Sequence, residues 1–354
     1  MKKVLLAMSG GTDSSVSAML LKKEGFEVIG IHFSFFDSSW AQVEVMEQQE
    51  RSIINVQELC KSLNIQYVEV NAAKEFYDTI ITYFVSEFYE GRTPFPCAIC
   101  NPELKWKLLY DKSIELNCDY IATGHYVKVI ENNGLHYISP GIDPEKDQSF
   151  FLWGLNQEIL KKTIFPLGDM KKIEVRDYAE RHGFTSVATR KDSLGICFLG
   201  NTDYRPFVTK ELKKQGITIP QGTHINEKGE ILSKNEGYVW YTIGQRKHLG
   251  IDLNTRLFVK EVDAKKNSVT LSSYEALYKN TFQIKDFYFH SIEDSKKPLI
   301  VKIRYRKQRN TCTLEMIDSK TIKVNLDKYL ESIAPGQTAV FYDEDRVVGG
   351  GFII

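Results

Sequence analysis

The stretch that decides the fold is "SGGTDSSV", Ser9–Val16, which directly follows the apolar run Val4–Met8. Two adjacent glycines and several hydroxyl side chains stand between a predicted strand and a predicted amphipathic helix. A glycine-rich turn at a helix N-terminus presents backbone N–H groups and the positive end of the helix dipole to an anion. The lysine that follows the glycines in the common nucleoside-triphosphate loop is missing. The sequence therefore predicts a phosphate-binding loop of a different kind.

The missing lysine bears on which phosphate the loop holds. In P-loop enzymes that transfer the γ-phosphate, a lysine supplies a point charge for that group. A loop without it suits the pyrophosphate of ATP, with attack on the α-phosphate. Asp13 is then a candidate ligand for the Mg²⁺ ion that neutralises this leaving group. The alternative is an ordinary glycine-serine turn capped by Asp13 or Ser14.

The composition bounds the class of protein. The chain has 354 residues, enough for two or three domains with a core each. Lys and Arg together number 46, as do Asp and Glu, so any attraction to nucleic acid must come from a local patch. The sequence shows no signal peptide and no apolar stretch near the roughly 20 residues that span a bilayer. We expect a cytoplasmic protein with no membrane partner.

The order of the predicted elements divides the chain. In the first half, apolar strands alternate with helical periodicities, and the strands are expected at Val4–Met8, Phe26–Phe33, Ile65–Val70 and Tyr120–Ala122. This alternation predicts an α/β fold with a parallel sheet covered by helices on both faces. Ligands of such sheets bind beyond the carboxyl ends of the strands, where both "SGGTDSSV" and "ATGHY" lie.

The second half changes character near Tyr204–Gln221, beyond which turn signals recur between short alternating segments. We interpret this half as one or two small antiparallel β barrels. The expected domains are an α/β nucleotide-binding domain at 1–204, a central β domain at 205–275 and a C-terminal β-barrel domain at 276–354.

The segment "KIRYRKQR", Lys302–Arg309, carries five Lys and Arg side chains in eight residues. On a strand, Lys302, Arg304 and Arg306 would share one face, which suits contacts with RNA phosphates. The alternative is a solvated charged face.

Six cysteines in a chain without a secretion signal argue against a disulfide scaffold and for a reducing compartment. We expect three of them to be ordinary buried residues, namely Cys60, Cys118 and Cys312. The segment "GRTPFPCAICNPELKW" reads as a helix with Asn101 as its N-cap and Pro102 at its first position. Cys100 would then precede a helix N-terminus, where the dipole lowers the pKa of a thiol.

Several long blocks, in order, are similar to those of one family. They are "SGGTDSSV", "GRTPxPxxxCN", "ATGHY", "KDQSFFL", "FPLGDMKKIEVRDYA", "KDSLGICFLG", "YTIGQRKHLGI", "VKIRYR" and "DEDRVVGGGFII". Together they cover essentially the whole chain, which resembles the tRNA-specific 2-thiouridylase (MnmA) family of PP-loop ATP pyrophosphatases. The resemblance implies an adenine nucleotide alpha hydrolase-like PP-loop domain followed by two small β domains.

The resemblance also implies an activity, which is ATP-dependent replacement of the wobble uridine O2 by sulfur in tRNAs that read Lys, Glu and Gln codons. It implies that Cys100 is the nucleophile and that Cys197, in "DSLGICFLG", receives a persulfide sulfur from a relay protein or a cysteine desulfurase. Adenylation would turn the carbonyl oxygen into a good leaving group, and AMP would depart. Attack of Cys100 on the persulfide would leave a Cys100–Cys197 disulfide that needs external reduction.

Further site residues follow from the resemblance block by block. The expected ATP contacts are Ala7, Met8, Ser9, Gly10, Gly11, Thr12, Asp13, Ser14, Phe33 and Gly124. The expected tRNA contacts are Phe95, Pro96, Cys97, His125, Lys146, Asp147, Gln148, Arg304, Tyr305 and Gln337. For His125 the alternative is a structural, hydrogen-bonded histidine.

Cys97 and Phe95 depart from the family pattern, which has Asp and Asn at these positions. The lost carboxylate puts base contact and proton handling in doubt. The new thiol creates Cys97-x-x-Cys100, and with Cys197 it makes three potential ligands of a 4Fe–4S cluster. We favour the simpler interpretation of Cys97 as a spare thiol beside a persulfide enzyme's nucleophile. Two alternative functions stay open: another PP-loop sulfurtransferase, and a non-catalytic tRNA-binding homologue.

Overall fold

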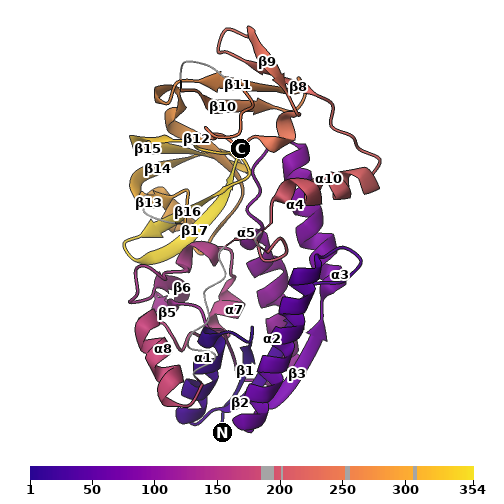
Figure 1. Cartoon of the computed structure of the whole chain (residues 1–354). Coiled ribbons are helices and arrows are strands. Elements are labelled where there is room, and N and C mark those ends of the chain that lie inside the picture. The colour runs from indigo at the N-terminus through magenta and orange to yellow at the C-terminus, as the bar shows by residue number, and fades with distance from the viewer. Residues whose placement is uncertain (185–194, 201, 252–255, 306–308) are drawn as a thin grey trace. The chain divides into compact units, whose positions relative to one another are not determined.

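The computed structural model describes residues 1–184, 195–200, 202–251, 256–305 and 309–354 (Figure 1). These residues form two compact units. The first unit comprises residues 1–80, 97–202 and 345–347, and the second comprises residues 81–96, 203–344 and 348–354.

The first unit is built on a five-stranded parallel sheet with strand order β3-β2-β1-β4-β7 (Figure 1). Its strands are β1 (Lys3–Ala7), β2 (Glu27–Ser34), β3 (Gln66–Asn71), β4 (Tyr120–Ala122) and β7 (Thr163–Ile164). The predicted α/β class and four of the predicted strands are confirmed. The pair Thr163–Ile164 was missed because two residues carry no readable periodicity.

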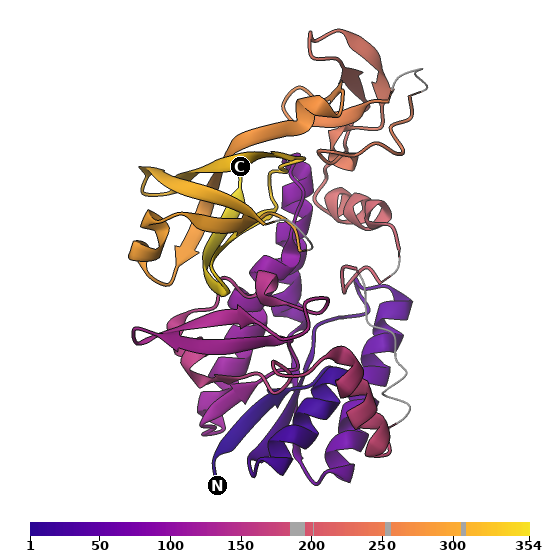
Figure 2. The same ribbon diagram turned by 90° about the vertical axis from the view of Figure 1, so that its left-hand side faces the viewer.

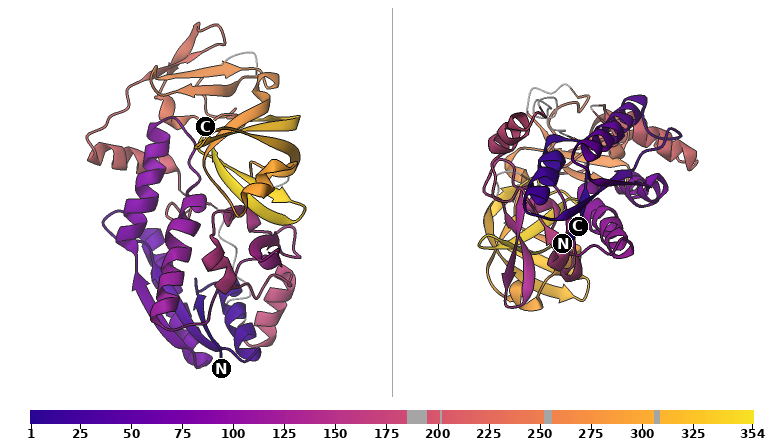
Figure 3. Two further views of the ribbon diagram at one scale, coloured as in Figure 1. Left: turned by 180° about the vertical axis from the view of Figure 1, so that it is seen from behind. Right: turned by 90° about the horizontal axis from the view of Figure 1, so that it is seen from below.

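Helices cover both faces of this sheet, as the two views in Figure 3 show. The longest are α1 (Thr12–Lys23), α2 (Val43–Ser62), α6 (Trp106–Glu115) and α8 (Lys172–Arg181), and the short ones are α3 (Ala73–Phe76) and α7 (Gln157–Lys162). Alternate residues of β1, Val4 and Leu6, pack with apolar side chains of α1 and α2 in one buried core. One face of the strand, formed by every second residue, therefore packs against the apolar faces of two helices.

The region around the predicted Asn101 N-cap differs from the prediction. Helix α5 (Pro96–Cys100) runs without a break into a π-helical turn at Asn101–Lys105 and then into α6. A proline ring clashes with the carbonyl four residues earlier in an α-helix, and the wider π turn accommodates Pro102. The helix starts at Pro96, and the Asn101 side-chain amide donates to the carbonyls of Cys97 (3.0 Å) and Phe151 (2.9 Å).

A β-hairpin that the sequence reading omitted follows β4. Its strands β5 (Val127–Asn132) and β6 (Leu135–Pro140) are joined by Asn133 and Gly134, both with positive φ. Asn-Gly between apolar alternations is a strong hairpin signal, so the sequence did contain this element.

The second unit contains α4 (Thr82–Tyr89), α10 (Tyr204–Lys214) and a four-stranded sheet of order β10-β11-β8-β9. The strands are β8 (Gly222–Ile225), β9 (Ile231–Asn235), β10 (Phe258–Asp263) and β11 (Ser268–Ser272). Strand β11 pairs with β8 in parallel, so the expectation of a wholly antiparallel domain is wrong here. A long connection separates these two strands, which lets the chain return in the same direction.

The predicted barrel is confirmed as a closed six-stranded barrel of order β12-β15-β14-β13-β16-β17, seen as orange and yellow strands in Figure 2. Its strands are β12 (Tyr278–Phe289), β13 (Leu299–Lys302), β14 (Asn310–Asp318), β15 (Thr321–Glu331), β16 (Thr338–Asp343) and β17 (Arg346–Ile353). Val301, Val324 and Phe341 are fully buried in its core. In the part of the chain that the structure describes, no helix has the length and apolar character needed to cross a membrane.

Candidate active site

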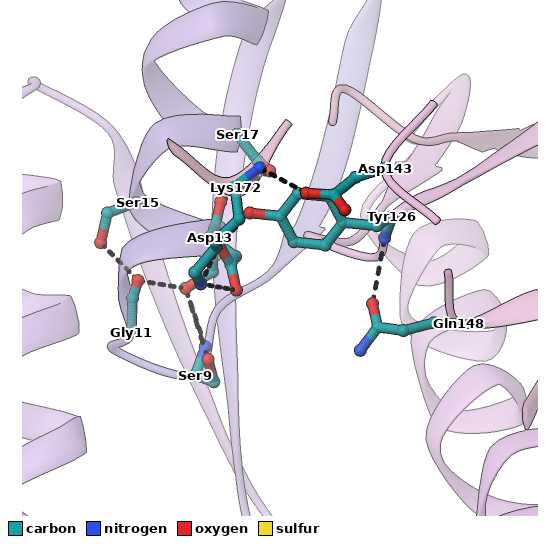
Figure 4. Close-up of polar contacts among 10 residues, drawn as sticks. Ser9, Gly11, Asp13, Ser15, Ser17, Tyr126, Asp143, Gln148 and Lys172 are labelled. Atoms are coloured by element: carbon teal, nitrogen blue, oxygen red, sulfur yellow. Dashed lines mark hydrogen bonds and ion pairs between the residues drawn. The ribbon is translucent and has the colours of Figure 1, made fainter. Parts of the chain in front are cut away.

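The predicted anion loop lies between β1 and α1 (Figure 4). Gly11 is the N-cap of α1, and its carbonyl accepts hydrogen bonds from the hydroxyls of Ser15 (2.9 Å) and Ser14 (3.2 Å). Gly10 has a φ of +72°, and a Cβ there would lie 2.7 Å from the backbone oxygen of Ser52. Only glycine fits this turn, and α1 begins directly after Gly11, so an anion here would meet the positive end of the helix dipole.

The Asp13 carboxylate is held by two side chains from distant parts of the chain. The Lys172 ammonium donates to both Asp13 oxygens at 2.8 Å, and the Tyr126 hydroxyl donates to Oδ1 at 2.6 Å (Figure 4). Lys172 is buried, and its backbone N–H donates to Asp143 Oδ2 at 2.9 Å. A cation therefore does stand at this loop, although it comes from the first residue of α8 rather than from the loop itself.

Sequence reasoning missed Lys172 and Tyr126 as site residues. Both lie inside blocks that it singled out, "FPLGDMKKIEVRDYA" and "ATGHY". No helix was predicted at this position. A helix starting at Lys172 would have been a usable signal, because a cation is unfavourable at the positive end of the helix dipole and needs an anionic partner there.

The segment after β4 reaches the anion loop. A Cβ on Gly124 would lie 2.9 Å from the backbone carbon of Asp13 and 2.9 Å from the nitrogen of Ser14. This close approach explains the glycine of "ATGHY". The next residue, His125, hydrogen-bonds Thr123 Oγ1 through Nδ1 at 2.7 Å. Burial and the nearby Lys105 ammonium lower its pKa to about 3, so this imidazole is neutral.

Three cysteines of the first unit, Cys97, Cys100 and Cys197, form what we call the thiol cluster. All three are free thiols in the structure; Cys100 is buried, whereas Cys97 and Cys197 are exposed. The Lys105 ammonium interacts electrostatically with all three sulfurs. The π-helical turn contributes to this geometry, because a wider turn brings residues five apart, such as Cys100 and Lys105, onto one face.

The expected dipole activation of Cys100 is wrong. Cys100 is the last residue of α5 and not a residue before a helix N-terminus. Burial raises the pKa of its thiol to about 12, against the opposing effect of Lys105. Cys97 and Cys197 reach solvent at their surface, but the protein around them still desolvates both thiols and raises their pKa, and Lys105 lowers both. At rest the cluster is therefore protonated beside one ammonium group.

Aromatic rings connect the cluster to the end of β2. Phe33 stacks on Phe35 with a centroid distance of 5.8 Å, and the Lys105 ammonium lies 6.0 Å from the Phe35 ring centroid. Phe33, the predicted adenine contact, is thus two ring contacts away from the cation of the thiol cluster. The anion loop and the segment "ATGHY" meet at one edge of the sheet, as predicted, and His125 of that segment lies near Lys105 of the thiol cluster.

The metal predictions concern Asp13 and the thiol cluster. A Mg²⁺ ion on Asp13 would compete with Lys172 for the same two oxygens, so the arrangement as it stands does not fit a metal there. Among the described residues, no group of three or more His, Cys, Asp and Glu side chains is arranged to hold a metal ion. The iron–sulfur alternative on Cys97, Cys100 and Cys197 stays a prediction for experiment.

The remaining expected tRNA contacts of the first unit, Lys146, Asp147 and Gln148, precede a 3₁₀ turn at Ser149–Phe151. The Asp147 carboxylate accepts from the backbone N–H (2.9 Å) and the hydroxyl (3.0 Å) of Ser149. Gln148 Oε1 accepts from the Tyr126 backbone N–H at 3.0 Å, which leaves its amide N–H₂ as the group that could read a base (Figure 4).

In the second unit, Gln337 holds the segment that precedes the thiol cluster in sequence. Its amide donates to the carbonyls of Thr93 (3.0 Å) and Pro94 (3.2 Å). The Phe95 backbone N–H donates to the Tyr83 hydroxyl at 3.4 Å, and Pro96 is buried. Gln337 therefore positions the "GRTPFP" segment.

The predicted basic stripe is wrong for Lys302. Strand β13 ends at Lys302, whose side chain is buried with its ammonium 4.4 Å from the Tyr342 ring centroid. Arg304 is exposed, 3.8 Å from Glu331 and 3.4 Å from the Ser332 carbonyl, and Tyr305 is half-buried. The bend after β13 breaks the alternation on which the stripe depended. Arg306 lies outside the described residues.

Family models match nearly the whole chain. The tRNA methyl transferase HUP domain matches residues 2–201, the tRNA methyl transferase PRC-barrel domain 206–273 and the aminomethyltransferase beta-barrel domain 279–353. Two solved structures align weakly, each at 16% identity: NMN synthetase from Francisella tularensis (TM-score 0.35, 61% of this chain and 78% of that chain) and a 4-thiouridine synthetase–RNA complex with bound ATP (TM-score 0.38, 60% and 50%).

Similarity to curated proteins extends from end to end. The chain is 46% identical over 354 residues to tRNA-specific 2-thiouridylase MnmA 2 of Phocaeicola vulgatus, covering 99% of this chain and 98% of that protein. It is 42% identical over 364 residues to tRNA-specific 2-thiouridylase MnmA 1 of Bacteroides fragilis, with 99% and 97% covered. On this full-length similarity, and with the PP-loop domain and both β domains in place, the chain belongs to the tRNA-specific 2-thiouridylase (MnmA) family.

Proposed function

We propose that this protein is an ATP-dependent tRNA-uridine 2-sulfurtransferase that thiolates the wobble uridine. Besides the membership of the family, the observation that best supports the proposal is the short path from the anion loop to the thiol cluster. Gly124 abuts the backbone of the anion loop, and the next residue, His125, lies beside Lys105, the cation of the thiol cluster. This arrangement supports an activating centre for ATP and a sulfur-handling centre at one edge of the sheet.

The anion loop serves the activation step. Its backbone N–H groups, with the hydroxyls of Ser9 and Thr12, would hold the pyrophosphate of ATP while the uridine O2 attacks the α-phosphate. The Lys172 ammonium supplies fixed positive charge where negative charge builds up on the departing pyrophosphate. Ala7, Met8, Gly10, Gly11, Ser14, Phe33 and Gly124 complete the proposed ATP contacts. Mg²⁺ would accompany ATP on its phosphates.

The thiol cluster serves the transfer step. Cys197 is exposed, as a residue that accepts a persulfide sulfur from a relay protein or cysteine desulfurase must be. The Cys100 thiolate then attacks the Cys197 sulfur, the terminal sulfur leaves as sulfide, and a Cys100–Cys197 disulfide forms. The sulfide attacks C2 of the adenylated uridine, and AMP departs. Lys105 stabilises the negative charge first on the Cys100 thiolate and then on the released sulfide.

We propose that the tRNA is gripped by residues of both units. Phe95, Pro96, Cys97, His125, Lys146, Asp147 and Gln148 are the candidates near the base, and Arg304, Tyr305 and Gln337 are the candidates in the β barrel. The wobble base must be flipped out of its stack for its O2 to reach the anion loop. We assign residues 1–204 to catalysis, and 205–275 and 276–354 to tRNA binding.

The test is reconstitution with ATP, Mg²⁺, unmodified tRNA and a persulfide donor. We expect AMP and pyrophosphate, and 2-thiouridine in the nucleosides analysed by mass spectrometry. Asp13→Ala should abolish all three products, because Lys172 and Tyr126 lose the carboxylate that positions them, and circular dichroism should show that the fold persists. Release of ADP and phosphate in place of AMP would contradict the adenylation mechanism.

A further inference from the structure

Cys97 stands one helical turn before Cys100 on α5 (Pro96–Cys100). Residues three apart in an α-helix have Cα atoms roughly 5 Å apart. Disulfides join residues whose Cα atoms are about 4.4–6.8 Å apart, so this pair meets the distance that a disulfide requires. The Asn101 amide, which donates to the Cys97 carbonyl at 3.0 Å, fixes the turn that carries both thiols.

The two thiols of this turn differ in access. Cys100 is only 6% exposed, whereas Cys97 on the same turn is open to solvent. Attack by a reductant requires an approach in line with the disulfide bond, which a large protein cannot make at a buried sulfur. In the Cys100–Cys197 disulfide a protein reductant can therefore attack only at Cys197, the sulfur that receives the next persulfide, whereas a Cys97–Cys100 disulfide offers exposed Cys97 instead.

Charge favours exchange among the three sulfurs. Lys105 faces Cys97, Cys100 and Cys197, so a thiolate formed on any of them is stabilised by the same ammonium group. The negative charge can then move from one sulfur to the next without leaving this cation. Thiol–disulfide exchange needs such a shared site, since a thiolate attacks and a thiolate leaves.

We propose that Cys97 is the resolving cysteine of the thiol cluster, a role that rests on the proposed function. After sulfur transfer, the Cys97 thiolate attacks the Cys100 sulfur of the Cys100–Cys197 disulfide. A Cys97–Cys100 bond forms, the Cys100–Cys197 bond breaks, and Cys197 leaves as a thiolate. A dithiol protein reductant then attacks exposed Cys97, is oxidised to its own disulfide, and returns both cysteines to thiols. Cys197 is free to accept the next persulfide before this reduction occurs.

The experiment maps disulfides after one turnover. The full-length protein is charged with persulfide by a cysteine desulfurase and cysteine, freed of excess reagents, and mixed with ATP, Mg²⁺ and unmodified tRNA without reductant. N-ethylmaleimide stops the reaction, and peptide mass spectrometry reports each cysteine. The native sequence should show a Cys97–Cys100 disulfide and alkylated Cys197, whereas Cys97→Ser should retain a Cys100–Cys197 disulfide. The control Cys118→Ser, which removes a buried thiol elsewhere, should give the native pattern.

A second persulfide gives a functional readout. After one turnover without reductant, the native protein should accept a second persulfide on Cys197, whereas Cys97→Ser should accept it only after dithiothreitol has reduced its Cys100–Cys197 disulfide. Equal charging of the two proteins before reduction would overturn the proposal.

Other outcomes separate this proposal from the proposed function. Alkylated Cys97 together with one 2-thiouridine per enzyme overturns the resolving role and leaves the thiolation function standing. Absence of 2-thiouridine overturns the proposed function, and a second experiment then tests Cys97 by itself. In that experiment stoichiometric diamide oxidises the reduced protein, which should yield the Cys97–Cys100 disulfide. Alkylated Cys97 after this treatment overturns the proposal. Near-stoichiometric iron after anaerobic purification, lost in Cys97→Ser, also overturns it in favour of a cluster.

Discussion

The anion loop and the thiol cluster use one lysine each, in opposite ways. Lys172 lies 2.8 Å from both oxygens of Asp13, so its charge is neutralised in the resting protein. Lys105 makes no ion pair with a carboxylate anywhere in the described part of the chain, and the titratable groups that raise its pKa are thiols that are protonated at rest. Lys172 is paired with a carboxylate that is charged at all times, whereas Lys105 gains an anionic partner only when a thiolate or sulfide forms.

This difference matches the chemistry proposed for each place. Pyrophosphate brings its own charges to the anion loop, so the cation there must be kept in position before ATP arrives. In the thiol cluster the negative charge appears only during sulfur transfer, on a thiolate and then on sulfide. A cation aimed at the place where charge develops lowers the barrier, since it interacts more strongly with the transition state than with the ground state.

The largest effect is expected from the thiols themselves. Cys100→Ser and Cys197→Ser should each reduce 2-thiouridine below detection, because a serine hydroxyl can neither carry a persulfide nor attack one. The anion loop is untouched, so binding of ATP, measured by calorimetry, should persist in both variants. The buried Cys118→Ser serves as control. Full thiolation by Cys197→Ser would refute the persulfide route.

Lys172→Met should reduce the rate of AMP formation by about 10²–10³-fold, the cost of removing one preorganised electrostatic group. The matched control is Lys171→Met, which removes the exposed neighbouring charge and should leave the rate within about twofold. The thermal unfolding temperature of the variant should be measured alongside the assay, because Asp13 loses its ion-pair partner. A rate equal to that of the native sequence would mean that Lys172 has only a structural role.

Lys105→Met tests the cation of the thiol cluster through pH. Burial raises the pKa of Cys100 to about 12, so the thiolate fraction, and with it the single-turnover rate of transfer, should increase by about tenfold per pH unit between pH 6.5 and 8.5. Without Lys105 the pKa rises further. The rate at a fixed pH should then fall about tenfold, with the profile displaced to higher pH.

The control for this prediction lies two residues further along the chain. Lys107 is exposed and paired with Asp111 at 2.7 Å, so Lys107→Met removes the same charge without touching the thiol cluster. Identical pH profiles for the two variants would show that Lys105 does not act on the thiols.

The sequence predicted the framework better than the electrostatics of the site. Strand and helix alternation placed the parallel sheet, and the glycines placed the anion loop, because these features are local. The Asp13–Lys172 pair joins residues 159 apart, and no local pattern encodes it. Cys100 was wrongly placed before a helix because Asn101-Pro102 is also a helix-start signal, and the π turn that absorbs Pro102 depends on packing around the Asn101 amide.

The smallest effect is expected on tRNA binding when Arg304 is replaced, because this side chain is exposed to solvent. Its nearest carboxylate, Glu331, is 3.8 Å away, and such exposed pairs contribute little. If Arg304 contacts a tRNA phosphate, Arg304→Ala should weaken binding a few-fold and reduce the slope of log affinity against log salt by roughly one unit. Lys320→Ala, which removes an exposed charge from the β14–β15 turn, is the control for net charge. Equal slopes for both variants would return Arg304 to an ordinary solvated side chain. The effect is small because solvent and counterions already screen an exposed guanidinium, whereas Lys172 is buried and acts where water is largely excluded.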